Sequence, residues 1–390
     1  MKAKQLAGIS AVLFAFFIQG FCDIVGISAE YAREAFGWSH TMAGLLPSMV
    51  FVWFLVVSIP VGIKMNRWGR KTTVLLGMGV TVAGMLVPLV GTGAACLVGY
   101  AALGIGNAML QVSQNALVRN VCGDERLLTS SITAGQVVKA VSSFCGPLLM
   151  LFAVNVLGGG NAGQWYLVFP VLGAITLLSA LWLWLTPIPR EDSEASDVTV
   201  VATLSLLSHR AVLLLFLGIF FVVGIDVGTN FVSSKVMIDR FGWEVTQAGL
   251  APQVYFVCRT VGALLGMVLL TRISSARYFR VSISACIAVI VLLAFCRFSA
   301  TVTLGLIGAV GLLCSCIFPI IYAEAVRREP ERANLVSGLM ITAVAGGGAV
   351  TPFIGYAIDS LGGIAAGVSV LLVCAAYLAF VSYSSLFAHS

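Results

Sequence analysis

Charged residues are scarce in this sequence. Asp, Glu, Lys and Arg together make up 10% of the 390 residues, whereas 59% are hydrophobic. A soluble domain carries about 25% charged residues, so a chain with this little charge could not cover a water-exposed surface. Lipid must therefore be the solvent for most of its length. The apolar runs are continuous rather than alternating, which excludes a transmembrane β-barrel.

Patterns that support catalysis or metal binding are also missing. The sequence has three histidines, all in loops or near chain ends, and it contains no phosphate-binding loop or nucleophile elbow. Nearly all of the ten cysteines fall within apolar runs, where they are interpreted as small packing residues. The sequence therefore predicts a protein that is not an enzyme and has no cofactor and no metal.

Twelve apolar runs are present, most of them close to the length of about 20 residues that spans a bilayer. They lie at 7–29, 42–64, 73–92, 94–118, 130–156, 165–186, 211–235, 246–271, 281–297, 301–325, 334–358 and 362–386. The longest polar stretch, 187–210, separates residues 1–186 from residues 211–390. We therefore predict an all-α membrane protein with two six-helix halves and a linker between them.

The distribution of Lys and Arg predicts how the helices are oriented. If the N-terminus is cytoplasmic, sixteen of the 22 basic residues fall in cytoplasmic segments, including 64–71, 272–280 and 327–332. Positive residues concentrate on the cytoplasmic side of membrane proteins. Both termini and the linker are therefore expected in the cytoplasm, with the protein in the inner (plasma) membrane. This bias also accounts for the net charge of +6, so no nucleic-acid partner is implied.

The sequence contains an internal repeat. Residues 36–52 align with residues 241–257 at an offset of 205, and ten of the seventeen positions are identical. The first two helices therefore correspond to the seventh and eighth, with the same topology. Parallel six-helix repeats with a binding site between them near the midplane are the layout of major facilitator transporters.

The loop after the second helix carries a family signature. Residues 62–71 resemble the G-x-x-x-D-R-x-G-R-K motif of the major facilitator superfamily, except that Asn66 replaces the Asp. The resemblance covers the whole chain, and it implies that Arg67, Gly69, Arg70 and Lys71 form a cytoplasmic gate. The alternative is a plain basic loop on the cytoplasmic side.

Within that superfamily, four segments resemble the fucose/galactose/glucose:proton symporters. They are residues 16–23, 103–115, 134–144 and 346–352, the last with three consecutive glycines that favour close helix packing. The resemblance implies uptake of a monosaccharide with protons. The chain differs from family members such as the fucose permease at Gln111, where they have a carboxylate.

Ionisable residues at membrane depth are costly and are therefore functional candidates. Asp23 and Asp226 lie within the first and seventh helices, and Lys139 and Arg259 within the fifth and eighth. Each acid is a candidate proton carrier, or else a structural partner of the base in its own half, Asp23 with Lys139 and Asp226 with Arg259. Glu324, at the inner end of the tenth helix, is expected to be solvated.

Amide side chains are the candidate sugar ligands, because an amide offers both donors and acceptors to hydroxyl groups. The fourth helix carries four amides, most of them on one face, and the resemblance implies that Gln136 on the fifth helix also faces substrate. The predicted substrate residues are Gln111, Asn115, Gln136, Asn230 and Gln253. The alternative role for these amides is hydrogen bonding between helices.

These observations predict a secondary transporter, driven by a gradient because no ATP-binding loop is present. The first hypothesis is a monomeric proton-coupled symporter for a hexose such as fucose, glucose or galactose. The alternative is a proton-coupled antiporter that exports small molecules or drugs. Antiporters of the superfamily carry Gly-x-x-x-Gly-Pro on the fifth helix, but here Ser142 precedes Gly146 and Pro147, which favours import.

Overall fold

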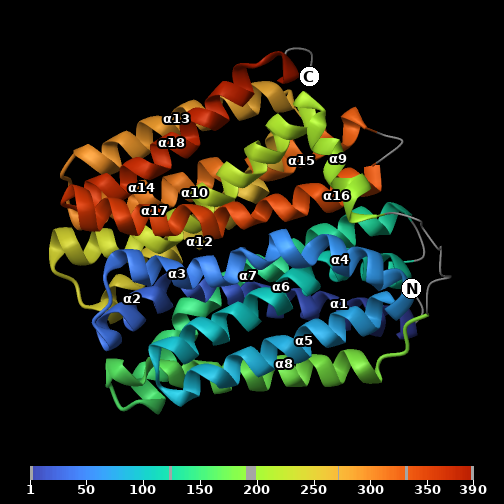
Figure 1. The fold of residues 1–390 in the computed structure, drawn as a ribbon, viewed down its shortest axis with the longest axis horizontal. Helices are drawn as coiled ribbons and strands as arrows, with labels where there is room; N and C mark the ends of the chain where they lie inside the picture. The colour runs from blue at the N-terminus through green and yellow to red at the C-terminus, as the bar shows by residue number, and fades with distance from the viewer. Residues whose placement is uncertain (1–2, 123–124, 190–198, 271, 330–332, 388–390) are drawn as a thin grey trace. The chain divides into compact units, whose positions relative to one another are not determined.

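The computed structural model describes residues 3–122, 125–189, 199–270, 272–329 and 333–387 (Figure 1). Within these ranges the chain forms helices and no strand. Twelve helical spans are long and apolar enough to cross a membrane, which confirms the predicted all-α membrane fold. They are Ala7–Phe36, His40–Met65, Arg70–Val90, Gly93–Val118, Val137–Leu157, Ala162–Leu185, Arg210–Phe241, Val245–Gly266, Ser275–Phe295, Ala300–Arg328, Gly338–Leu361 and Ile364–Tyr383.

The chain divides into two compact units, of which the first comprises Met1–Ile24 and Trp53–Ala202. In it, α5 packs on α6 and α8, and α1 packs on α7. The buried rings of Tyr100, Trp165 and Phe169 form part of its core. Its main helices are α1 (Ala3–Gln19), α4 (Trp53–Trp68), α5 (Arg70–Leu86), α6 (Gly93–Cys122), α7 (Glu125–Phe152) and α8 (Val168–Leu185).

The second unit comprises Val25–Val52 and Thr203–Ser390. Residues 25–52 thus group with the C-terminal part of the chain, because α3 packs on α17 and α2 packs on α10. Its main helices are α2 (Val25–Phe36), α3 (His40–Phe51), α10 (Arg210–Phe241), α12 (Leu250–Leu269), α13 (Ser275–Phe295), α14 (Ala300–Cys314), α15 (Ile317–Arg328), α16 (Ala333–Thr342), α17 (Gly346–Leu361) and α18 (Ile364–Tyr383).

The first span is not one continuous α-helix. It changes to a 3₁₀ segment, η1 (Gly20–Ile24), between α1 and α2. A Cβ atom on Gly20 would lie 2.6 Å from the carbonyl oxygen of Lys139, so glycine lets η1 approach α7 closely. Short 3₁₀ stretches within a helix often mark functional hinges, and this one carries Asp23.

The glycine run in α17 allows the close helix packing expected from the sequence. A Cβ atom on Gly346 would collide with the backbone of Phe220 in α10, and one on Gly348 would lie 3.0 Å from the backbone nitrogen of Val52. Any larger residue would push these helices apart.

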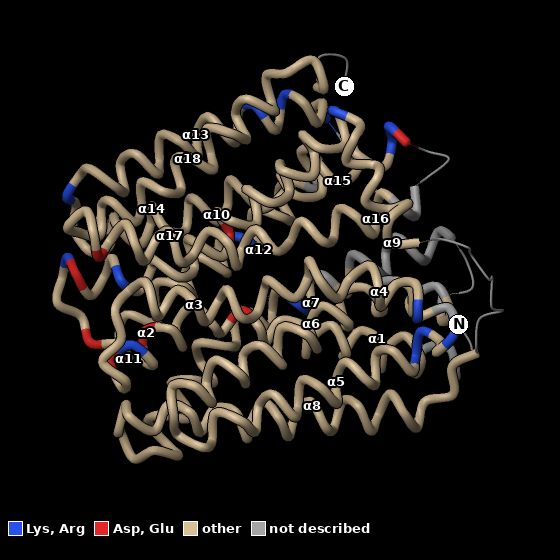
Figure 2. Tube along the Cα trace, viewed as in Figure 1, with Lys and Arg blue, Asp and Glu red and all other residues tan. Residues whose placement is uncertain are grey.

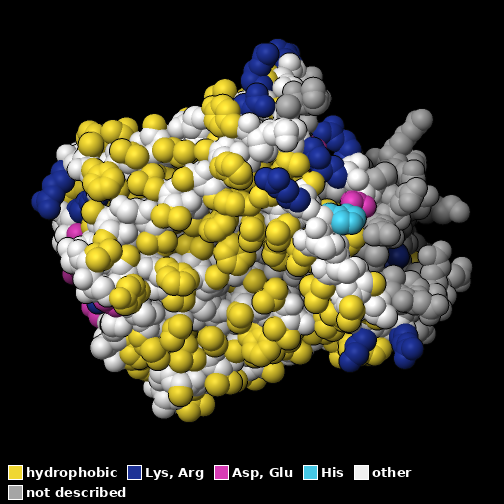
Figure 3. Space-filling view, turned by 45° about the horizontal axis from the view of Figure 1, so that its top comes forward, with side chains coloured by type: hydrophobic (Ala, Val, Ile, Leu, Met, Phe, Trp, Pro, Cys, Tyr) yellow, Lys and Arg dark blue, Asp and Glu magenta, His cyan; other side chains and the backbone are white. Residues whose placement is uncertain are grey.

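The surface agrees with a lipid environment. Large hydrophobic side chains are exposed along α8, including Leu178, Trp184 and Leu185, and hydrophobic side chains are spread across the middle of the face in Figure 3. Charged residues lie mainly toward the helix ends (Figure 2). Burying these apolar side chains in lipid removes them from water.

One expectation about a charged residue is wrong. Glu324 is buried rather than solvated, and it pairs with Arg327 and Arg328. The Arg328 Nε atom lies 2.7 Å from Glu324 Oε1. Arg327 and Arg328 each lie one turn after Glu324 on α15, so both can reach back to a carboxylate on the packed side of the helix.

Candidate functional site

A polar cluster joins three helices inside the first unit. Gln19, the last residue of α1, donates a hydrogen bond from Nε2 to Oε1 of Gln111 on α6. The ammonium group of Lys139 on α7 lies 3.5 Å from the same oxygen. Gln19 is buried, and its Oε1 has no hydrogen-bond partner among the described residues. The cluster therefore presents amide and ammonium groups within an apolar bundle.

Asp23 lies next to this cluster in η1. Ser143 on α7 donates from Oγ to Asp23 Oδ2 at 2.5 Å, and its Oγ also lies 3.0 Å from the carbonyl oxygen of Lys139. A serine hydroxyl has one proton and two lone pairs, so Ser143 can donate to an ionised Asp23 or accept from a protonated one. The structure places Lys139 beside Gln111, and an ion pair between Asp23 and Lys139 stays a prediction.

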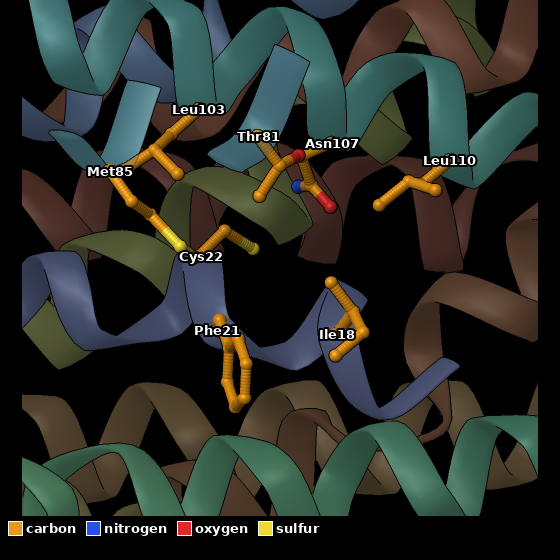
Figure 4. Close-up of a pocket in the computed structure, with 8 residues that line it drawn as sticks. All are labelled: Ile18, Phe21, Cys22, Thr81, Met85, Leu103, Asn107 and Leu110. Carbon is orange, nitrogen blue, oxygen red and sulfur yellow. The ribbon is translucent and has the colours of Figure 1, made fainter. Parts of the chain in front are cut away.

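The amides of α6 differ in what they contact. Gln114 is fully buried and donates to the carbonyl oxygen of Ala15 on α1 at 2.8 Å, which ties two helices together. Asn107 lines a small, mainly apolar pocket with Cys22, Thr81 and five other residues (Figure 4). Figure 4 shows the Asn107 amide beside Thr81. The pocket belongs to the packing of α1, η1, α5 and α6.

Two of the predicted sugar ligands lie outside the described side chains. They are Asn115 on α6 and Gln136 on α7. Their assignment remains a prediction.

A second charged cluster lies within the second unit. Arg259 Nη2 on α12 lies 2.8 Å from Asp226 Oδ2 on α10, and Tyr255 donates its hydroxyl to Asp226 Oδ1. The Asp226 and Arg259 side chains are 24% and 34% exposed, whereas Tyr255 is fully buried. Two donors on one turn of α12 thus contact the two carboxylate oxygens of Asp226.

The remaining predicted ligands of this unit are buried. Gln253 lies on α12, and Asn230 lies one turn beyond Asp226 on α10. A Cβ atom on Gly26 of α2 would collide with the Asn230 amide, so Asn230 packs directly on that helix. Substrate contact by either residue stays a prediction.

The signature loop is bound to its own unit. Gly69, with a φ of +88°, precedes α5 in a conformation that favours glycine. Arg70 Nη1 donates to Asn120 Oδ1 at 2.7 Å, and Lys71 Nζ donates to the carbonyl oxygen of Thr186 at 2.7 Å, just after α8. Cations at a helix C-terminus are favourable. Arg67 is exposed, and the role of the loop as a gate remains a prediction.

The sequence did not predict a hydrogen-bonding role for three residues of these clusters. They are Gln19, Ser143 and Tyr255. Each lies four residues from a predicted site residue, Gln19 before Asp23, Ser143 after Lys139 and Tyr255 before Arg259. This one-turn spacing on a helix is the signal that could have found them.

Comparison with known proteins identifies the family. A model of the Major Facilitator Superfamily matches residues 9–352, and the chain belongs to that superfamily, whose members are transporters rather than enzymes. It is therefore a multi-pass membrane transporter.

The chain is 24% identical to a glucose/galactose transporter of Brucella abortus over 388 residues, which cover 95% of this chain and 92% of the relative. It is 24% identical to the fosmidomycin resistance protein of Escherichia coli over 285 residues, covering 72% and 68%. The crystal structure of the E. coli fucose:proton symporter FucP superposes with a TM-score of 0.69 at 20% identity, over 97% and 98% of the two chains. This likeness in structure concerns the fold.

Proposed function

We propose that this transporter takes up a monosaccharide together with protons by alternating access, as a monomer. The observation that carries the proposal is the cluster of Gln19, Gln111 and Lys139 beside Asp23. Neutral amides can replace the water bound to sugar hydroxyls, while a carboxylate one helical turn away binds and releases a proton. The name of the Brucella relative supports a sugar as the substrate.

The direct test is uptake of labelled hexoses into membrane vesicles, with and without an imposed pH gradient. We expect accumulation of at least one hexose when the outside is acidic, and only equilibration when the gradient is collapsed by an ionophore. Hexose accumulation that does not depend on the pH gradient would contradict proton coupling. Failure to bind or move any hexose would contradict the sugar assignment.

Gln111→Ala is expected to weaken sugar binding about five-fold or more. A lost hydrogen bond to a neutral group costs about 1 kcal/mol, which corresponds to that change in Kd. Isothermal titration of the purified protein would measure it, and Gln136→Ala should behave in the same way.

Gln114→Ala is the matched control for Gln111→Ala. The two glutamines lie on one helix, but Gln114 binds the backbone of α1. Its loss should lower the unfolding temperature and leave Kd unchanged. Wild-type affinity in both Gln111→Ala and Gln136→Ala would place the sugar elsewhere.

A second candidate function is export of a small molecule in exchange for protons. The name of the E. coli fosmidomycin resistance protein favours it. Ser142, in place of the first glycine of the antiporter motif, weighs against it. Export would be supported if the protein made a sensitive host resistant to a drug and the purified protein bound no hexose.

The distribution of Lys and Arg predicts that both termini and the linker lie in the cytoplasm. A cysteine introduced at Ala195, in the linker, should therefore resist a membrane-impermeant maleimide in intact cells and react after permeabilisation. Ala35→Cys is the matched control, because Ala35 is exposed and precedes the first predicted outer loop. Labelling at position 195 but not at position 35 in intact cells would show that the orientation is opposite to the predicted one.

A further inference from the structure

A buried ion pair in the second unit takes no part in the clusters described above. Lys235 of α10 donates to Glu30 of α2, and both side chains are only 1% exposed. Arg33, one turn further along α2, places Nε 2.5 Å from the other Glu30 oxygen. The Lys235 ammonium also lies 4.5 Å from the centre of the Phe231 ring. Such burial is tolerated because each charge is paired.

The two partners occupy equivalent positions of the internal repeat. Glu30 and Lys235 are 205 residues apart, which is the offset that aligns residues 36–52 with residues 241–257. Where two copies of a repeat meet around a two-fold axis, the equivalent positions that lie at the axis face each other. Identical charges there would repel, whereas this chain has an acid in one copy and a base in the other.

A second charged contact lies at the start of α3. Asp359, near the end of α17, accepts hydrogen bonds from the backbone nitrogens of His40 (3.1 Å) and Thr41 (2.7 Å) and from Thr41 Oγ1 (2.5 Å). The first N–H groups of a helix have no partner within the helix, and a carboxylate there is favourable. Asp359 thus caps a helix that lies more than 300 residues away in the sequence.

Between helices α3 and α17 the packing is very close. Ser48 Oγ donates to the carbonyl oxygen of Gly348 at 2.5 Å, and Thr351 Oγ1 donates to that of Gly44 at 3.0 Å. A Cβ atom on Gly44 would lie 2.7 Å from the carbonyl oxygen of Thr351. At these positions α3 and α17 therefore meet through direct backbone and side-chain contacts.

We propose that Glu30, Lys235 and Asp359 form a latch that closes one end of the transport path. In alternating access the repeats separate at one end and then at the other, and this latch joins α2 and α3 of the first repeat to α10 and α17 of the second. Charged groups suit such a joint, because they are paired when the helices meet and hydrated when they part. The predicted orientation makes this the outer end. The proposal rests on the proposed function only in requiring alternating access, whichever solute is carried.

The test measures how readily the latch opens, using purified protein in lipid nanodiscs without sugar. The reporter is a cysteine in place of Ser48 (Ser48→Cys), which is buried against α17 while the latch is closed. The readout is the rate at which this cysteine reacts with a polar maleimide. Reaction of the chain's own cysteines is measured in protein without the reporter and subtracted. Glu30→Gln should raise the rate at least tenfold, because closing would bury Lys235 without its carboxylate. Glu30→Gln combined with Lys235→Met should return the rate toward that of the parent, because closing no longer buries a charge at either position.

Glu34→Gln is the matched control, since it removes the same charge from an exposed position of the same helix and should leave the rate unchanged. Asp359→Asn gives an independent arm that leaves the buried pair intact, and it should also speed labelling. If Glu30→Gln or Asp359→Asn, correctly folded by size-exclusion chromatography, labels no faster than Glu34→Gln, the latch is overturned. Because no sugar is present, these outcomes are independent of the sugar assignment.

Discussion

Asp23→Asn is expected to abolish uphill accumulation of sugar while sugar exchange across the membrane continues. Asparagine has the shape of a protonated aspartate but cannot release or take up a proton. Asp23 lies in the 3₁₀ break of the first span, where Ser143 can serve either protonation state. Exchange needs no net proton step, so it should survive the substitution. Exchange is measured as the entry of labelled sugar into vesicles loaded with unlabelled sugar. Accumulation is measured as the entry of labelled sugar into vesicles under a pH gradient.

Asp239→Asn is a suitable control for this experiment, because Asp239 is exposed near the end of α10 and its loss should alter neither activity. Ser143→Ala should give an intermediate result, with coupled uptake reduced and exchange retained, since Asp23 would lose a hydrogen-bond partner but keep its proton. If the Asp23→Asn protein still concentrates sugar, Asp23 is not the proton carrier. Asp226 then becomes the next candidate.

Arg259→Met is expected to lower transport at least tenfold and to reduce the unfolding temperature. Removing one partner of a fully buried ion pair costs about 3–5 kcal/mol, and a tenfold change corresponds to about 1.4 kcal/mol. The Asp226–Arg259 pair is partly exposed, so the full penalty will not apply, but among the described residues Asp226 would keep the Tyr255 hydroxyl as its side-chain donor. Transport assays and thermal unfolding of the purified protein report the two effects.

The double variant Asp226→Asn with Arg259→Met separates structure from coupling. If the pair is purely structural, removing both charges should recover both stability and accumulation. If stability returns but accumulation does not, while exchange persists, Asp226 takes part in proton coupling. Arg297→Met is the control, because Arg297 is exposed. Unchanged transport and stability in Arg259→Met would show that the pair serves neither role.

The side-chain partners show where sequence reasoning reached its limit. Gln111 and Gln114 are the same residue type three positions apart, yet one meets Gln19 and Lys139 while the other bonds to the backbone of α1. Helical spacing indicates that both face protein rather than lipid, but it does not identify the neighbour. The expectation that Glu324 is solvated is wrong for a related reason. A position near a helix end does not show whether that side of the helix is packed, and on α15 it is packed.

The sequence by itself determined the twelve spans, the parallel repeat and the superfamily, because these depend on local properties. A span is recognised from about 20 consecutive apolar residues and few charges, and a repeat or motif from the order of residues along the chain. Only the tertiary structure decided that the first span breaks at η1 and that residues 25–52 pack with α10 and α17. It also decided that Glu30 meets Lys235 and that Asp359 caps α3. These contacts join residues hundreds of positions apart, and they form because a charge or a free N–H group removed from water must find whichever partner the packed helices bring to it.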